Sequence, residues 1–183
     1  MRITSHTVQA GIAATIMVLG AARLEAQRAG ESGGAIDSKS GRFLTEFTGV
    51  PARVPDTLAV SDARVFAALP AVFSALAVPL TVVDSSAKAM GAVRVLVRRP
   101  IAGQRLSLLL ECGTGSYGPN AERYSVQLTL VARAKAIAST HTEVMTMVRG
   151  DAAPNGLSTS VKCASSGRLE DRFAELLRNE VAR

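Results

Sequence analysis

Three side chains of the kind that hydrolases use lie in the second half of the chain: Ser116, His141 and Asp151. A nucleophilic serine needs a base within hydrogen-bond reach and a carboxylate that orients this base. His141 is the base candidate, because the other histidine, His6, lies close to the N-terminus. No motif or spacing places the three side chains together. A hydrolase is therefore the third of three functional hypotheses, and the sequence predicts no catalytic residue.

A glycine-rich segment, Gly113–Gly118, surrounds Ser116. It is not a phosphate-binding loop, because no Gly-Lys-Ser/Thr sequence follows it. It is not a nucleophile elbow either, because that turn needs a glycine two residues before the serine and Thr114 stands there. The segment predicts a loop between strands, with glycines at positive φ.

The two cysteines, Cys112 and Cys163, are expected to form a disulfide, because an even, isolated pair outside the cytosol is most simply oxidised. The alternatives are two buried thiols, or a metal site shared with His141. Such a metal site would lack the close Cys-x-x-Cys spacing of zinc sites. The sequence therefore predicts no metal site and no cofactor.

Residues 1–26 have the parts of a secretory signal peptide. Arg2 gives a positive start, Ala10–Ala22 is a short uncharged run, and Arg23–Ala26 is polar and ends in a small residue. The run is shorter than the about 20 residues of a membrane-spanning helix, and an uncleaved anchor is the alternative. We therefore expect a periplasmic or secreted protein with no stable membrane span after cleavage.

The rest of the chain divides into a linker and a domain. Residues 27–56 form a flexible linker, because Gln27–Gly41 is dominated by Gly, Ser and charged residues. A short strand is expected within this linker at Phe43–Thr48. Residues 57–183 are expected to form one α+β globular domain.

Two amphipathic helices are predicted at the ends of this domain. Ser61 is a good N-cap, and the apolar stripe in Val65–Leu76 continues in phase across Pro70, which predicts a kinked helix. A second stripe within Leu169–Val181 predicts a C-terminal helix with Ser166 as its N-cap.

Alternating apolar residues predict strands between the two helices. The expected strands are Leu80–Val83, Val93–Val97, Leu106–Cys112, Tyr124–Leu130 with an extension to Ile137, and Thr142–Val148. Asp84–Ser86 is expected to be a turn, Gly91 a bend or bulge, and Pro100–Gly103 a hairpin connection. The sequence therefore predicts an α+β two-layer sandwich, in which an antiparallel sheet of about four strands is packed by both helices.

The formal net charge is +6, and it falls to +5 without residues 1–26. Six basic residues are expected on one outer sheet face, where they are solvated and discourage edge-to-edge pairing. They are Arg94, Arg98, Arg99, Arg105, Arg133 and Lys135. Nucleic-acid binding is not expected, because the chain has only five Phe, two Tyr and no Trp for base stacking.

The segments Ser61–Leu76, Pro79–Asp84 and Gly91–Val93 form a helix, a strand that ends in Asp, a turn, and a strand that begins near Gly. This order resembles exported helix-grip-like domains, including those of accessory lipoproteins in outer-membrane protein assembly. The pieces Cys112-Gly113 and Cys163–Glu170 resemble uncharacterised exported bacterial α+β proteins. The chain departs from the lipoproteins because no lipidation cysteine follows its apolar run. The resemblance implies a fold and no catalytic residue.

The first functional hypothesis is a non-enzymatic, disulfide-stabilised exported domain that binds a protein or a cell-envelope partner. Such binding predicts an exposed apolar patch or an uncovered sheet edge. The second hypothesis is a carrier of a small apolar ligand between the sheet and the first helix, where the small residues Ala67, Ala68 and Ala71 leave room.

Overall fold

The structure, a computed structural model, describes residues 54–155 and 159–183. The predicted signal peptide, almost all of the predicted linker and the strand expected at Phe43–Thr48 lie outside the described residues. All described residues belong to the unit Ala35–Arg183 and form a mixed α+β fold with a mostly antiparallel sheet, as predicted.

The described residues form nine strands and four helices. In chain order these are β1 (Asp56–Leu58), α3 (Asp62–Ala75), β2 (Val82–Asp84), β3 (Ala89–Val97), α4 (Leu106–Leu109), β4 (Leu110–Glu111), β5 (Thr114–Gly115), β6 (Gly118–Pro119), α5 (Asn120–Arg123), β7 (Ser125–Ala138), β8 (His141–Ala153), β9 (Val161–Ser165) and α6 (Arg168–Val181).

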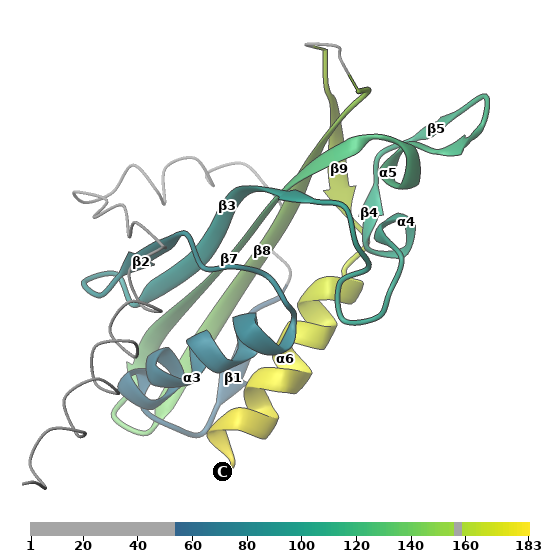
Figure 1. Cartoon of the computed structure of the whole chain (residues 1–183). Coiled ribbons are helices and arrows are strands. Elements are labelled where there is room, and N and C mark those ends of the chain that lie inside the picture. Colours follow the sequence, from purple (N-terminus) through teal and green to yellow (C-terminus); the bar gives the residue numbers. More distant parts are fainter. Residues whose placement is uncertain (1–53, 156–158) are drawn as a thin grey trace, which may run out of the picture. The chain divides into compact units, whose positions relative to one another are not determined.

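The main sheet has seven strands rather than the predicted four or so. Its order is β2-β3-β7-β8-β9-β4, and β1 pairs with β8 beside this path. Every pair is antiparallel. The hairpin of β7 and β8 forms its centre, and the small hairpin of β5 and β6 stands apart from it (Figure 1). The sheet is larger than expected because short strands extend it on both sides of this hairpin.

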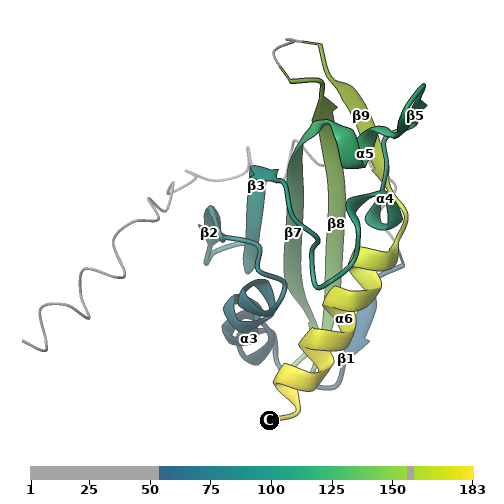
Figure 2. The same cartoon turned by 45° about the vertical axis from the view of Figure 1, so that its right-hand side comes forward.

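Both long helices lie across one face of the sheet, side by side (Figure 2). Their apolar stripes are buried there, and Phe73 of α3 meets Phe173 of α6 edge to face, with ring centroids 5.5 Å apart. Facing them, β7 contributes Val126, Leu128 and Leu130, all fully buried. The period of two in β7 and the helical period of α3 and α6 therefore bury one common core.

The helix α3 begins as predicted. The Ser61 hydroxyl accepts a hydrogen bond from the Arg64 amide at 3.4 Å and thereby caps the first turn. The helix is continuous across Pro70, which lies on its exposed side. In the described part of the chain, no helix is both long enough and apolar enough to cross a membrane.

The prediction of one strand over Leu106–Cys112 is wrong. Residues Leu106–Leu109 form the helical turn α4, and only Leu110 and Glu111 are in a strand. The buried leucines are Leu106, Leu109 and Leu110, whereas Leu108 is 44% exposed. Their spacing of three and four residues fits a helical turn, so burial at that spacing overrides the alternation in the sequence. Pro100–Gly103 consequently does not join two paired strands, although Ile101 and Gln104 form an isolated bridge there.

Two local predictions also need correction. Gly91 lies in regular pairing opposite Val131, and the bulge in β3 falls between Ala92 and Val95. The glycine is needed because a Cβ there would lie 2.8 Å from the Leu130 carbonyl oxygen. The N-cap of α6 is Gly167, at φ 86°, rather than Ser166, whose hydroxyl donates to the Leu108 carbonyl at 2.7 Å.

Candidate functional site

The structure does not bring Ser116, His141 and Asp151 together. Ser116 lies in the turn between β5 and β6, and His141 is an exposed residue at the first position of β8. Asp151 is ten residues further along β8, a distance of roughly 33 Å in an extended strand. Its carboxylate forms an ion pair with Lys162. These three residues therefore form no catalytic triad.

The predicted disulfide between Cys112 and Cys163 is confirmed. It joins β9 to the residue that follows β4, and both sulfur-bearing side chains are buried. Among the described residues, no group of acidic, histidine and cysteine side chains is arranged to hold a metal ion.

The six basic residues do not share one face. Three of them lie on the sheet face opposite the helices. Arg133 and Lys135 are odd-numbered residues of β7, whose even-numbered residues face the helices. Arg94 lies on the same face, because it donates a hydrogen bond to the odd-numbered Gln127. Arg98 and Arg99 come after the end of β3. Arg105 precedes α4. The bulge and the helical turn interrupt the period of two on which the prediction rested.

The space between α3 and the sheet is filled by side chains. Val65, Leu69, Val72 and Phe73 of α3 are at most 1% exposed, and Ala68 packs against the same core. The small residues of α3 therefore give no specific support to a ligand carrier.

The outer edge of β8 is covered only at its two ends by described strands. At one end, β1 pairs with Thr142–Val144. At the other end, β9 pairs with Gly150–Ala152 and then leaves β8 to pair with β4. Between these pairings, the stretch Met145–Val148 has no paired strand on that side within the described ranges. We call this stretch the open edge of β8.

The phase of the hydrogen bonds shows which residues of the open edge point outward. The Ala134 amide of β7 donates to the Lys88 carbonyl, on the β3 side, at 2.9 Å. Even-numbered residues of β7 therefore bond toward β3, and odd-numbered ones bond toward β8. Val131 faces Met147 across β7 and β8, so the odd residues of β8 bond to β7. The backbone groups of Thr146 and Val148 consequently point away from the sheet.

A cavity of about 700 Å³ lies directly against the open edge. Its floor is Thr146–Gly150, and its opposite wall is formed where β9 diverges and α6 begins, from Lys162 to Gly167. Cys163 belongs to this wall, so its disulfide to Cys112 holds β9 in place at the point where β9 turns away from β8. A second cavity of about 320 Å³ shares Thr146 and Glu170 with the first and extends toward β1.

Charged side chains at the two cavities form ion pairs and hydrogen bonds within the fold. Lys162 pairs with Asp151, and Arg178 of α6 pairs with Asp56 of β1 at 3.4 Å. Glu170 is 8% exposed and accepts a hydrogen bond from the Ser165 hydroxyl at 2.6 Å. These charged side chains are therefore engaged within the fold, whereas no described strand pairs with the outward backbone groups of Thr146 and Val148.

Sequence reasoning missed Thr146 and Val148, because both look like ordinary residues of an alternating strand. The predicted strands carried no signal either, because the prediction here was Thr142–Val148 and no strand was predicted at β1 or β9. The signal lies in the observed strand lengths. A strand of 13 residues flanked by strands of three and five residues cannot be covered completely on that side. Comparisons of the chain with protein-family models, curated proteins and solved structures give no match.

Proposed function

We propose that this chain is an exported binding domain that adds an extended segment of a partner protein to its sheet at the open edge of β8. The observation that carries the proposal is the outward direction of the Thr146 and Val148 backbone into a cavity of about 700 Å³. Export is supported by the Cys112–Cys163 disulfide. Binding without catalysis is consistent with the separation of Ser116, His141 and Asp151.

Strand addition supplies affinity through the main chain and specificity through side chains. An added antiparallel strand would place one residue opposite Thr146 and another opposite Val148, which allows four main-chain hydrogen bonds. At a net value of about 1 kcal/mol each, these bonds contribute about 4 kcal/mol. Micromolar affinity needs about 8 kcal/mol, so side chains of the partner must supply the remainder.

The pleat determines where those side chains go. Residues opposite Thr146 and Val148 point to the helix face, toward Gly167 and Glu170 at the start of α6. The residue between them points to the other face, beside Met147. The partner segment is therefore expected to alternate, with side chains that fit the cavity on one face and an apolar side chain on the other.

A proline substitution tests the open edge without breaking the centre of the sheet. In Thr146→Pro the lost amide is one that points outward, so the pairing of β7 with β8 is retained. Thr146→Val is the matched control, because it keeps the amide and the strand preference. A photoreactive benzophenone side chain at position 162, on the cavity wall, reports on the occupant in the cells that produce the protein.

The proposal predicts a cross-linked partner protein for the chain with threonine or valine at position 146. The cross-link should fall at least about tenfold with proline, because a hydrogen bond is lost and the ring blocks the approach of a strand. Mass spectrometry of the adduct should locate a short segment of the partner. An equal yield with proline and valine, in proteins with the same melting temperature, contradicts binding at this edge.

A further inference from the structure

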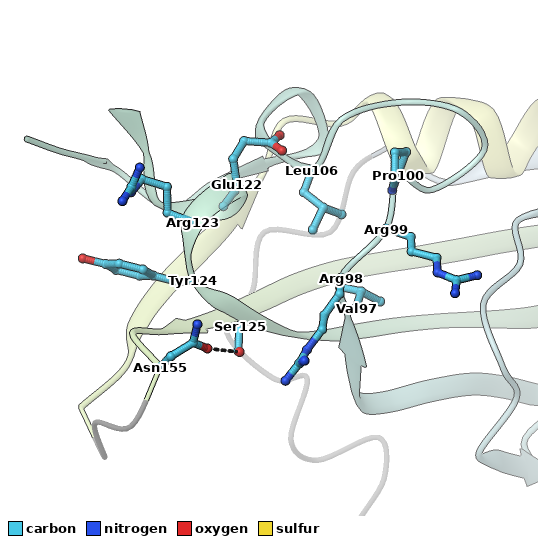
Figure 3. A pocket seen from close by; sticks show the side chains of 11 residues that line it. Val97, Arg98, Arg99, Pro100, Leu106, Glu122, Arg123, Tyr124, Ser125 and Asn155 are labelled. Atoms are coloured by element: carbon cyan, nitrogen blue, oxygen red, sulfur yellow. Dashed lines mark hydrogen bonds between the residues drawn. The ribbon is translucent and has the colours of Figure 1, made fainter. Parts of the chain in front are cut away.

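A third, smaller cavity lies at the far end of the sheet from the β7–β8 turn, between the end of β3 and the start of β7. Its volume is about 220 Å³. Val97–Pro100 line it from one side, Ala121–Ser125 from the other, and Asn155 closes it from the end of β8 (Figure 3). Leu106 of α4 also lines the cavity, so its walls come from four segments that the fold brings together.

Positive charge dominates the lining of this cavity. Arg98, Arg99 and Arg123 contribute three guanidinium groups, and Glu122 is the one carboxylate among the lining residues. The Glu122 carboxylate is engaged elsewhere, since it accepts a hydrogen bond from the Ser107 amide at 2.9 Å. This bond to Ser107, with the charge of Arg105 as a smaller cause, lowers the pKa of Glu122 and keeps it ionised. The net charge around the cavity is therefore +2.

Arg98 is the guanidinium that is best placed to bind a ligand. In the view of Figure 3 its side chain extends on the side of the cavity where Ser125 and Asn155 are drawn, whereas Arg99 extends to the other side. Arg123 lies over the Tyr117 ring, 5.1 Å from its centroid. The ion pairs formed among the described residues involve side chains other than Arg98.

Asn155 is a second polar residue that lines the cavity. Its side-chain oxygen accepts a hydrogen bond from the Ser125 hydroxyl at 2.8 Å, which fixes the orientation of the amide. The amide nitrogen then points away from Ser125, and it can donate hydrogen bonds. Arg98 and the Asn155 amide thus add one charged and one neutral donor to the lining.

We propose that this cavity binds a phosphate group, either free or carried by a lipid headgroup. A guanidinium matches the oxygen atoms of phosphate through two parallel hydrogen bonds. The net charge of +2 matches a phosphate dianion better than a single carboxylate. Arg98 provides the paired hydrogen bonds, Asn155 provides one more, and Arg99 and Arg123 contribute charge at a longer distance.

The experiment measures binding of inorganic phosphate to the purified protein by isothermal titration calorimetry at constant ionic strength. We expect Arg98→Gln to weaken binding at least about tenfold, because a charge-assisted bidentate contact is lost. Asn155→Asp should weaken it as well, since it keeps the acceptor for Ser125 but places a negative charge beside the phosphate. Lys135→Gln is the matched control, because it removes one positive charge from an exposed position of β7 outside the cavity.

Vesicles that contain phosphatidic acid, whose phosphate monoester can carry two negative charges, distinguish the two sources of the phosphate group. Vesicle binding that depends on Arg98 but not on Lys135 assigns the site to a lipid headgroup, and binding of inorganic phosphate alone assigns it to a soluble phosphate compound. Equal losses for Arg98→Gln and Lys135→Gln indicate diffuse attraction by net charge and overturn the proposal. Absence of binding to both probes also overturns it.

Discussion

Removal of the Cys112–Cys163 disulfide should cost a large share of the stability of this domain. The bond closes a loop with a sequence separation of 51 residues. In the chain-entropy model, a loop of that length is worth about 4 kcal/mol at 25 °C. Typical domains are stable by about 5–15 kcal/mol, so loss of the bond should leave the fold close to its stability limit.

Two forms of the protein separate the cross-link from the packing. Reduction of the wild-type chain removes the cross-link and keeps both sulfur atoms, so it should lower the free energy of unfolding by about 4 kcal/mol. The double variant Cys112→Ala with Cys163→Ala also removes the sulfur atoms, which are buried. The small void should cost up to about 1 kcal/mol more. Alanine is preferred to serine because a buried hydroxyl would add its own desolvation cost.

Urea unfolding followed by circular dichroism measures both quantities. The dependence of the free energy of unfolding on urea concentration should also rise without the cross-link, because the unfolded chain then exposes more surface. A loss below about 1 kcal/mol in the reduced protein, with an unchanged slope, would refute the assignment of a major stabilising role to this bond.

Two further substitutions test the packing of β3 and the turn that precedes it. Gly91→Ala places a Cβ 2.8 Å from both the Leu130 oxygen and a Val131 methyl group, so it should lower the free energy of unfolding by about 2 kcal/mol. Gly115→Ala in the β5–β6 hairpin places its Cβ 3.1 Å from the Asn120 side-chain oxygen and should cost less, below about 1 kcal/mol. Equal effects contradict the close approach of β3 and β7. Asp84→Asn should cost about 1 kcal/mol at pH 7, because the Ser86 hydroxyl, the Ala87 amide and the Ser86 amide hold the pKa of Asp84 below its ordinary value of 3.8. The stabilisation by the ionised carboxylate is complete above pH 3.8 and is lost as the pH falls through the lower pKa of the folded state. The free energies of unfolding of the variant and the wild type should therefore converge in acid. A difference between them that stays constant from pH 7 to the acid limit contradicts this role of Asp84.

The elements predicted correctly are those whose own sequence shows a clear hydrophobic period. The stripe of α3 and the cap at Ser61 are confirmed, as are the long alternating strand β7 and its return as β8. The disulfide followed from an even, isolated pair of cysteines in a chain expected to be exported. These features depend on residues that are close in sequence or on chemistry that has few alternatives.

The features that were missed depend on contacts between distant segments. Leu106–Cys112 alternates as a strand does, but packing selects Leu106 and Leu109 for burial and leaves Leu108 outside. Ser166 looks like an N-cap, and its hydroxyl does accept a hydrogen bond from the Arg168 amide at 3.5 Å, but the cap position falls on Gly167 and the same hydroxyl donates to the Leu108 carbonyl, 58 residues away. The open edge of β8 exists because β1 and β9 meet opposite ends of one long strand, and no local pattern encodes where they stop.

Amide hydrogen exchange of the free protein, resolved by residue with NMR, tests the open edge most directly. The account predicts that the Thr146 and Val148 amides exchange faster than the Val144 and Gly150 amides, which face β1 and β9. The Met145 and Met147 amides should be protected, because they face β7. Protection of Thr146 and Val148 equal to that of Val144 and Gly150 would contradict an edge that is open to a partner strand.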